Sequence, residues 1–241
     1  MDYKDFLISL SESHGALPED FFAEDVTRGL YIHLCELEEK GKLFNLTAIT
    51  DPREAVRKHA VDSLFAAMAV RELSAGEEKT LLDIGCGAGF PSLPIAIACE
   101  NVSVTALDST AKKCEFVKST AQKCGVGLET LPERAEEAVE GRRETFDFVT
   151  ARAVARLTIL AELAAPFLKA GGYFLAMKGS AAEEERLEAC RASKILGLTY
   201  ERSLDYEIED GGARSILVYR KTAPTPQTYP RRFAQIKKKP L

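Results

Sequence analysis

Apolar residues recur at three- and four-residue spacing through much of the first 75 residues, which predicts helices in this part of the chain. The clearest repeat covers residues 21–40. A second helical segment is expected to begin at Asp51 and Pro52, because aspartate is a favoured N-cap and proline fits the first helical turn. Residues 42–50 lie between the two segments and predict a short extended or turn conformation.

From Lys79 onward the pattern changes to short apolar runs separated by amphipathic segments. The short runs are typical of buried strands, and they cover residues 80–84, 102–108, 127–131, 146–151 and 171–177. Helices are expected between or after these strands, over residues 93–99, 111–124, 155–168 and 181–196. Alternation of strands and helices indicates a mostly parallel sheet.

Two longer runs near the end of the chain, residues 198–208 and 213–220, are separated by the turn-forming residues 209–212 and predict a hairpin. The sequence therefore predicts an α/β fold with a mostly parallel seven-stranded sheet, an antiparallel hairpin at the edge of the sheet, and additional N-terminal helices. Three parts are expected: an N-terminal helical extension packed on the core over 1–75, the core over 76–221 and a basic C-terminal tail over 222–241.

The composition is that of an ordinary globular protein. Of 241 residues, 46% are hydrophobic and 29% are charged, which excludes disordered, collagen-like and disulfide-stapled classes. No apolar run reaches the ~18 residues that a membrane span needs. The first ten residues carry acids and lack the basic-then-apolar pattern of a signal peptide. We therefore expect a cytoplasmic protein with no membrane contact.

The cysteines and histidines do not form a metal motif. The six cysteines are far apart and include no C-x-x-C pair, and the three histidines are scattered. We expect reduced, mostly buried cysteines and no bound metal.

Charge is unevenly distributed along the chain. The formal net charge is −5, but residues 211–241 contain no acid and eight basic residues: Arg214, Arg220, Lys221, Arg231, Arg232, Lys237, Lys238 and Lys239. A basic end on an acidic body indicates contact with a polyanion, because lysine or arginine placed against phosphate releases counterions. The alternative is a solvated tail that only improves solubility. The Pro-rich segment 222–230 favours an extended linker over a packed helix.

A glycine-rich loop follows the first predicted strand of the core. In residues 81–90, LLDIGCGAGF, glycines stand at 85, 87 and 89. Glycines let the backbone approach a ligand closely, and the helix that follows offers free N–H groups. A dinucleotide-binding G-x-G-x-x-G motif would need its third glycine at Phe90, so that motif is not met. Asp83, just before the first glycine, fits better near a cation than near a pyrophosphate.

A second acidic residue, Asp108, ends the next predicted strand. A carboxylate at this position can accept hydrogen bonds from both hydroxyls of an adenosine ribose. S-adenosylmethionine combines such a ribose with a cationic sulfonium and ammonium and with a carboxylate, so Asp83, Asp108 and the loop amides together provide matching groups. The alternative is that both aspartates only cap strand ends.

At this point the sequence resembles class I methyltransferases with a Rossmann-like fold, and in particular the RsmG (GidB) family. The resemblance covers roughly residues 40–241. Its motifs are NLTAI at 45–49, His59 with Asp62 and Ser63, FPSLP at 90–94, LDS at 107–109, RAEE at 134–137, ARAVAR at 151–156, AMKG at 176–179 and YPRR at 229–232. It implies an enzyme that transfers a methyl group from S-adenosylmethionine to N7 of a guanine in 16S rRNA, with this RNA or the small ribosomal subunit as its partner.

Candidate cofactor-binding residues come from two sources. The resemblance implies one set by position: Gly85, Phe90, Ala135, Glu136 and Arg152. The loop and the second strand supply the other: Asp83, Gly87, Gly89 and Asp108, to which the LDS motif of the resemblance adds Ser109. Without the resemblance, Ala135 and Glu136 would be interpreted as the start of a solvated helix.

Candidate substrate contacts are basic. Guanine N7 has an exposed lone pair, so its attack on a methyl group requires no general base and no catalytic residue of that kind is expected. Arg152, Arg156 and Lys178 follow predicted strand ends and are expected on the RNA side of the cleft. The predicted RNA-binding residues are Lys178, Arg231, Arg232, Lys237, Lys238 and Lys239. His59 and Asp62 are three residues apart and are expected to buttress the glycine loop.

Two other functions stay open at this stage. A methyltransferase for small molecules or proteins would share residues 79–180 but would have no use for the basic end. A binding protein without activity could keep the cofactor pocket, although the intact loop does not favour this alternative.

Overall fold

The computed structural model describes residues 1–13, 15–44, 46–209 and 211–241. Asp210 of the predicted hairpin turn and Asn45 of the NLTAI segment lie outside the described residues. The centre of the molecule is a seven-stranded sheet in the order β3-β2-β1-β4-β5-β7-β6. Its strands are β1 Lys79–Ile84, β2 Val102–Leu107, β3 Leu128–Leu131, β4 Phe146–Arg152, β5 Leu168–Lys178, β6 Leu198–Ile208 and β7 Gly212–Lys221. The predicted seven-stranded α/β fold is confirmed.

The direction of the strands is also as predicted. Strands β1 to β5 pair in parallel, whereas β7 pairs antiparallel with both β5 and β6. Strand β1 lies between β2 and β4, so the chain order reverses at this strand. Such a switch point opens a crevice beyond the carboxyl ends of the strands, where ligands of doubly wound sheets bind. The glycine loop that follows β1 therefore begins at this crevice.

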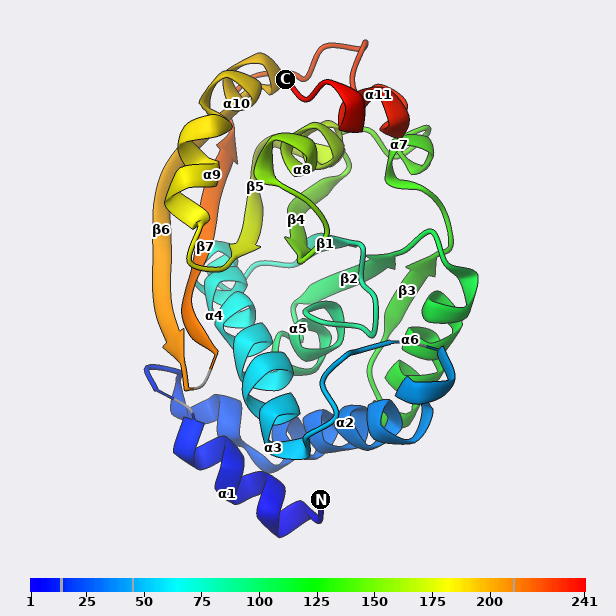
Figure 1. Ribbon diagram of the computed structural model, residues 1–241, viewed down its shortest axis with the longest axis vertical. Helices are drawn as coiled ribbons and strands as arrows, with labels where there is room; N and C mark the ends of the chain where they lie inside the picture. Colours follow the sequence, from blue (N-terminus) through cyan, green and yellow to red (C-terminus); the bar gives the residue numbers. More distant parts are fainter. Residues whose placement is uncertain (14, 45, 210) are drawn as a thin grey trace.

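Helices surround the sheet (Figure 1). The α-helices are α1 Tyr3–Ser13, α2 Glu24–Phe44, α3 Pro52–Ala55, α4 Asp62–Ser74, α5 Ser92–Ala98, α6 Ala111–Cys124, α7 Ala135–Ala138, α8 Leu157–Ala164, α9 Ala182–Glu188, α10 Cys190–Leu196 and α11 Phe233–Lys238. Three short helices of other types are η1 Glu19–Phe22, η2 Val56–Val61 and η3 Ala165–Phe167.

The two faces of the sheet are covered by different helices. Successive side chains of a strand point to opposite faces, so Leu81 belongs to one apolar cluster and its neighbour Leu82 to another. The first cluster includes the N-terminal helices with α5 and α6, and it contains Phe6. The second includes α8, α10 and α11, and it contains Ile236. Both ends of the chain are thus packed into the core, on opposite sides of the sheet.

Several local predictions can be compared with this structure. Asp51 is the N-cap of α3, where its side chain accepts a hydrogen bond of 2.8 Å from the backbone N–H of Glu54, so this predicted helix start is confirmed. The extended segment predicted from residue 42 is wrong for residues 42–44, because α2 continues to Phe44. No proline interrupts this stretch before Pro52. The single helix predicted over 181–196 is divided at Ala189 into α9 and α10.

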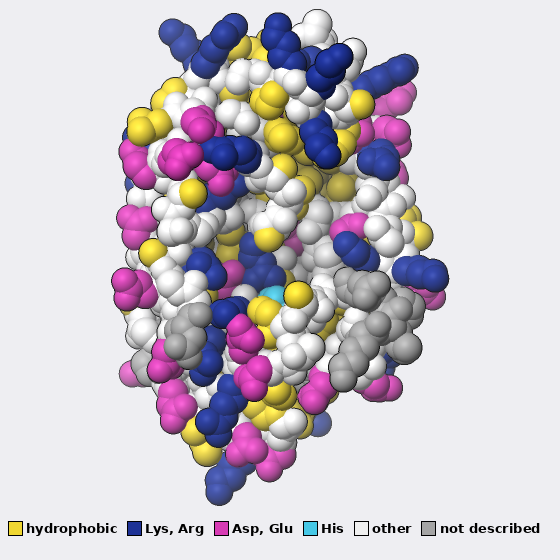
Figure 2. All heavy atoms as spheres, in the orientation of Figure 1, with side chains coloured by type: hydrophobic (Ala, Val, Ile, Leu, Met, Phe, Trp, Pro, Cys, Tyr) yellow, Lys and Arg dark blue, Asp and Glu magenta, His cyan; other side chains and the backbone are white. Residues whose placement is uncertain are grey.

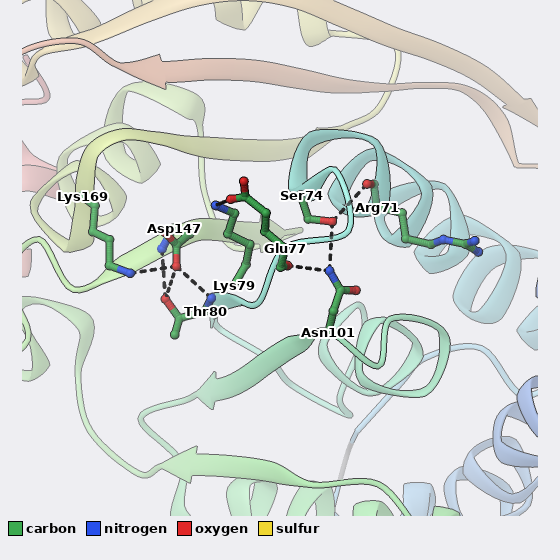
Figure 3. A network of polar contacts seen from close by, with 8 residues as sticks. All are labelled: Arg71, Ser74, Glu77, Lys79, Thr80, Asn101, Asp147 and Lys169. Carbon is green, nitrogen blue, oxygen red and sulfur yellow. Dashed lines mark hydrogen bonds and ion pairs between the residues drawn. The ribbon is translucent and has the colours of Figure 1, made fainter.

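A network of polar contacts ties together the amino-terminal ends of the strands, opposite the glycine loop (Figure 3). The Asp147 carboxylate on β4 accepts hydrogen bonds from the backbone N–H and hydroxyl of Thr80 on β1, at 2.9 and 2.7 Å, and from Lys169 on β5 at 2.8 Å. Burial opposes ionisation of Asp147, but the bonds from Lys169 and Thr80 prevail and lower its pKa. This end of the sheet is held by structural contacts, which leaves the opposite end for ligands.

The basic tail is attached to the body of the protein. Residues 222–232 contain no helix, in agreement with the Pro-rich sequence, but α11 follows and its Ile236 side chain is fully buried. The Lys221 ammonium at the end of β7 is also buried and donates to the backbone oxygens of Ala165 and Leu196 at 2.8 and 3.2 Å. These contacts place the tail beside α8 rather than free in solvent.

Candidate cofactor and substrate site

A cavity of about 510 Å³ opens beyond the carboxyl ends of β1, β2 and β4, at the switch point of the sheet. Figure 2 shows that this face of the molecule is hollowed. The cavity walls include eight of the residues predicted to bind the cofactor: Gly85, Gly87, Phe90, Asp108, Ser109, Ala135, Glu136 and Arg152. Residues far apart in the sequence are thereby brought to one site, as the resemblance implied.

The backbone of the loop after β1 requires glycine. Gly85 and Gly89 have φ angles of 74° and 88°, a left-handed region that other residues rarely adopt. A Cβ atom on Gly85 would lie 2.5 Å from Cγ2 of Val154, and one on Gly89 would lie 2.7 Å from Cδ1 of Leu93. The Gly85 N–H donates to the backbone oxygen of Leu107 at 2.7 Å. The loop is therefore fixed against the end of β2 and open toward the cavity.

Asp108 lines the same cavity and contacts this loop directly. One carboxylate oxygen accepts a hydrogen bond of 3.2 Å from the Gly87 N–H, and the other accepts one of 2.9 Å from the Thr110 N–H. Lys113 approaches the same carboxylate at 3.6 Å. These contacts fix the orientation of the carboxylate at the cavity wall, where its remaining lone pairs can accept the hydroxyls of a bound sugar.

Asp83 is placed differently from Asp108. Its side chain is fully buried, does not line the cavity, and accepts hydrogen bonds from the Ser92 N–H at 3.3 Å and the Thr150 hydroxyl at 3.2 Å. Burial raises the pKa of Asp83 to about 6, although these hydrogen bonds favour the charged form. In this structure Asp83 joins β1 to β4 and to the start of α5, beneath the loop.

Phe90 is held between two histidine rings. The ring of His33 from α2 stacks at 4.1 Å on Phe90, and the ring of His59 from η2 stacks at 4.7 Å. The Nε2–H of His33 donates to the backbone oxygen of Ala88 at 2.7 Å. Burial lowers the pKa of His33 to about 4 and that of His59 to about 3. Both rings are therefore neutral at pH 7, and they buttress the glycine loop as predicted for His59.

Arg152 connects this stack to a polar network. Its guanidinium donates to the Asp62 carboxylate at 2.9 Å and to the backbone oxygen of Lys58 at 3.0 Å, and its other terminal nitrogen lies 3.3 Å from Nδ1 of His59. The Tyr206 hydroxyl donates to the second Asp62 oxygen at 2.8 Å. Arg152 is thus oriented at the cavity wall by several partners.

A second cavity, of about 610 Å³, adjoins the first. The two share His59, Arg152, Ala153 and Val154. Val154 is unusual because its apolar side chain is 38% exposed, and the preceding Ala153 has a φ of 54°. The loop after β4 therefore presents an apolar side chain at the boundary between the two cavities.

The remaining basic candidates have different surroundings. Lys178 lines the second cavity. Arg156 is paired with Glu184 and Glu188 on α9, at 3.3 and 2.5 Å. Arg231 is paired with Glu162 on α8. Arg232, Lys237, Lys238 and Lys239 have exposed side chains, as does Arg156.

The sequence did not indicate the site positions of several residues, among them the following three. His33 and Val154 contact the glycine loop, and Phe233 of α11 lines the first cavity. The only signal for His33 was an isolated position in a predicted helix. Phe233 follows the segment 222–230 that was expected to be a linker, and it was expected to be available for stacking on an RNA base, not to line the cofactor cavity. Val154 lies inside the ARAVAR motif, which is visible in the sequence, but the motif does not indicate that this side chain contacts the glycine loop.

The described residues contain no group of three or more His, Cys, Asp or Glu residues that could hold a metal ion. Among them there is also no helix with the length and apolar character needed to cross a membrane.

The strand order, the glycine loop after β1 and the acidic residue after β2 together define a class I methyltransferase. Comparison with known proteins agrees. The profile of a family described as "GidB: rRNA small subunit methyltransferase G" matches residues 28–207, and the chain belongs to this family. The RsmG resemblance is confirmed.

Individual relatives support the same assignment. Ribosomal RNA small subunit methyltransferase G of Lactobacillus johnsonii is 42% identical over 210 residues, which cover 86% of this chain and 87% of that protein. The protein of the same name from Streptococcus thermophilus is 39% identical over 244 aligned positions, which cover 100% of both.

Solved structures resemble the core of the chain. M. jannaschii TYW2 in complex with AdoMet has a TM-score of 0.52 at 12% identity, over 66% of this chain and 74% of that one. P. horikoshii TYW2 in complex with MeSAdo has a TM-score of 0.50 at 18% identity, over 63% and 60%. At these identities the likeness supports the fold.

Proposed function

We propose that this protein transfers a methyl group from S-adenosylmethionine to N7 of a guanine in 16S rRNA of the small ribosomal subunit. The observation that carries the proposal is the pair of adjoining cavities. One is built of the glycine loop and Asp108, and the other is lined by four basic side chains, Lys58, Arg152, Lys178 and Arg214, together with Asp62 and Glu185. The names of the relatives, which describe small-subunit rRNA methyltransferases, support the RNA substrate.

The first cavity fits the proposed cofactor. Its volume of about 510 Å³ is within the usual range of ligand pockets, roughly 300–1,000 Å³. Asp108 would accept the ribose hydroxyls, and the backbone at Ala135 and Glu136 would contact the adenine edge. Gly87 leaves room for close approach by the methionine part, because a Cβ atom there would meet nothing closer than the backbone oxygen of Gly85 at 3.9 Å. When bound, S-adenosylmethionine supplies an electrophilic methyl group.

The chain's own residues would act mainly by positioning. Because guanine N7 carries an exposed lone pair, no group has to remove a proton from it before the attack. The walls shared by the two cavities, at Arg152 and Val154, would hold the purine beside the methyl group, and alignment of this kind supplies much of the rate in enzymes. The Asp62 carboxylate stabilises Arg152 in its orientation.

The exposed basic side chains of the tail would contact the RNA backbone. In Figure 2, Lys and Arg side chains lie along the upper edge of the hollowed face, where Figure 1 shows α11. Phe233 places the same helix at the wall of the first cavity. Phosphates held by Arg232 and the lysines of residues 237–239 would therefore lie near the reacting base.

Methyl transfer to defined substrates tests the proposal. Labelled S-adenosylmethionine is incubated with intact small subunits and with 16S rRNA freed of protein, and the labelled nucleoside is identified after digestion. We expect 7-methylguanosine from at least one of the two substrates. Label found only in protein or in small molecules would overturn the RNA function, and failure to bind the cofactor in calorimetry would overturn the enzymatic one.

A further inference from the structure

An ion pair is enclosed at the wall of the second cavity. Lys178, at the end of β5, and Glu185, on α9, both line this cavity and are joined by a contact of 2.8 Å. Their side chains are only 8% and 16% exposed. Charged groups form strong, directional hydrogen bonds, and burial strengthens them because less water competes. A ligand that displaces the remaining water from this pair would therefore be held in a defined orientation.

The pair has unused bonding capacity. The Lys178 ammonium is ion-paired with Glu185 and donates a hydrogen bond to the backbone oxygen of Ala155 at 2.7 Å, and a lysine has three donors. Glu185 Oε2 is the atom ion-paired with Lys178, and it accepts a hydrogen bond from the Leu157 N–H at 2.7 Å. Within the described part of the chain, Glu185 Oε1 accepts no hydrogen bond. The pair therefore offers a ligand one donor and one acceptor side by side.

This pattern is complementary to the six-membered ring of guanine. Guanine presents the O6 acceptor next to the N1–H donor, so an ammonium and a carboxylate can bind it together. Adenine has the reverse order, with a donor amino group beside the N1 acceptor. Uracil has the guanine order but no N7. Of the four RNA bases, only guanine both matches the pair and carries the proposed methyl acceptor.

The position of the pair agrees with this recognition. The two cavities meet at His59, Arg152 and Val154. A purine whose O6 and N1–H contact the ion pair extends its five-membered ring, with N7, toward the first cavity, and the exposed side chain of Val154 can cover the ring. We propose that Glu185, together with Lys178, selects guanine by binding its O6 and N1–H. This inference rests on the proposed function.

Base analogues provide the test. Small subunits are reconstituted with RNA that carries guanosine, inosine or 2,6-diaminopurine at the nucleotide that the unaltered chain methylates. Inosine keeps O6 and N1–H, whereas 2,6-diaminopurine keeps N7 but reverses the edge. We expect kcat/KM for inosine within about threefold of guanosine and for 2,6-diaminopurine at least ~100-fold lower, since mismatched buried polar groups are strongly rejected.

Glu185→Gln should relax this selectivity. An amide can accept from N1–H or donate to the N1 of a reversed edge, so the preference for guanosine over 2,6-diaminopurine should fall about tenfold or more. The matched control is Glu183→Gln, because Glu183 lies on the same helix but is 67% exposed and pairs with Arg186. S-adenosylhomocysteine binding should be unchanged in both variants. Glu185→Asp keeps the carboxylate and should keep the preference at a lower kcat/KM.

The possible failures are distinguishable. If Glu185→Gln keeps the full preference, if Glu185→Asp loses it, or if inosine is rejected like 2,6-diaminopurine, the assignment of Glu185 is overturned while methyl transfer stands. If the unaltered chain transfers no methyl group to guanosine in either RNA substrate, the proposed function is overturned and the assignment with it.

Discussion

The guanidinium of Arg231, in the C-terminal tail, forms a two-point ion pair with the carboxylate of Glu162 on α8. Its Nε lies 2.8 Å from one carboxylate oxygen and its Nη2 lies 2.5 Å from the other. The Glu162 side chain is 0% exposed, and it also accepts the Arg231 backbone N–H at 2.9 Å. The charge of Glu162 is thus compensated by a residue 69 positions later in the chain.

Arg231→Ala should therefore be strongly destabilising. Removal of one partner leaves a buried charge uncompensated, which costs about 3 kcal/mol or more of the free energy of unfolding. Denaturant unfolding of the variant measures this loss. Arg232→Ala is the control, because Arg232 is exposed and its loss should change the free energy by less than about 0.5 kcal/mol. Equal effects of the two changes would show that the pair does not hold the tail.

Gly85→Ala should weaken cofactor binding by steric conflict. The new Cβ would stand 2.5 Å from Val154 Cγ2 at a φ of 74°, so the loop must shift. We expect at least a tenfold loss of S-adenosylhomocysteine affinity in calorimetry. Gly125→Ala is the matched control: its φ is also 74°, but nothing lies within 4 Å. It should cost about 1 kcal/mol of stability and leave binding intact.

The double variant Gly85→Ala with Val154→Ala separates the two causes of the loss. Removal of the valine methyl groups relieves the contact and leaves only the backbone strain, so part of the affinity should return. If the double variant binds no better than Gly85→Ala, contact with Val154 is not the reason.

Asp108→Asn should weaken cofactor binding without unfolding the protein. The amide keeps the size of the side chain and one oxygen acceptor, but it loses the charge, and hydrogen bonds to charged groups contribute about 1.5–3 kcal/mol. We therefore expect a loss of roughly 10- to 100-fold in S-adenosylhomocysteine affinity by calorimetry. Asp147→Asn, at the opposite end of the strands, should reduce stability but not affinity. The role of Asp108 would be refuted by equal affinities of this variant and the unaltered chain.

His33 should make the protein less stable in acid. Its pKa is about 4 in the folded chain against 6.5 for an ordinary histidine, so the unfolded chain binds the extra proton more readily between these values. Stability is consequently lost as pH falls from 6.5 to 4, by about 3 kcal/mol from this residue. Protonation would charge Nδ1, which is buried and finds no partner among the described residues.

His33→Gln isolates this effect from other titrating groups. The amide can still donate to Ala88 but does not titrate. The free energy of unfolding of the unaltered chain, minus that of His33→Gln, should fall by about 3 kcal/mol when the pH is lowered from 7 to 4. Phe6→Leu, another fully buried change, should give a constant difference over the same range. A constant difference for His33→Gln as well would contradict the prediction.

Replacement of the lysines at 237–239 by alanine should weaken RNA binding through charge alone. Each phosphate contact contributes about 0.7–0.9 to the slope of log affinity against log salt, so the slope should fall by about 2–3. The control carries three exposed lysines changed elsewhere: Lys112, Lys118 and Lys194. Cofactor affinity should be the same in both. If the slope of log affinity against log salt is unchanged in the tail variant, these lysines do not contact RNA phosphates.

Local sequence signals were sufficient for the sheet and the glycine loop. Short apolar runs identify the strands because strands buried on both faces have few polar positions. The glycine spacing identifies the loop because the backbone there needs positive φ. Asp108 was predicted at the cavity because it directly follows a predicted strand of the parallel sheet, and ligands bind beyond the carboxyl ends of such strands.

Other parts of the site depend on distant contacts and could not be predicted locally. The basic tail has the composition of a linker, but Arg231 finds Glu162 and Ile236 enters the core. Asp83, like Asp108, lies near the end of a predicted strand, so the local sequence provides no reason to treat the two differently. In the structure Asp83 lies beneath the loop, where the Ser92 N–H and the Thr150 hydroxyl donate hydrogen bonds to its carboxylate. Phe233 lines the cavity because the tail packs against the body of the protein. This packing depends on distant contacts, so the position of Phe233 could not be predicted from the local sequence.

The packing of α11 has a practical consequence for experiments on this protein. Because Phe233 forms part of the cofactor cavity, shortening the chain before this residue removes a piece of its wall as well as the positive charge. The two effects would be confused in any truncation, whereas point changes at exposed lysines keep them apart. The N-terminus lies at the end of the molecule opposite to α11 (Figure 1), so a purification tag attached to Met1 would be remote from this helix.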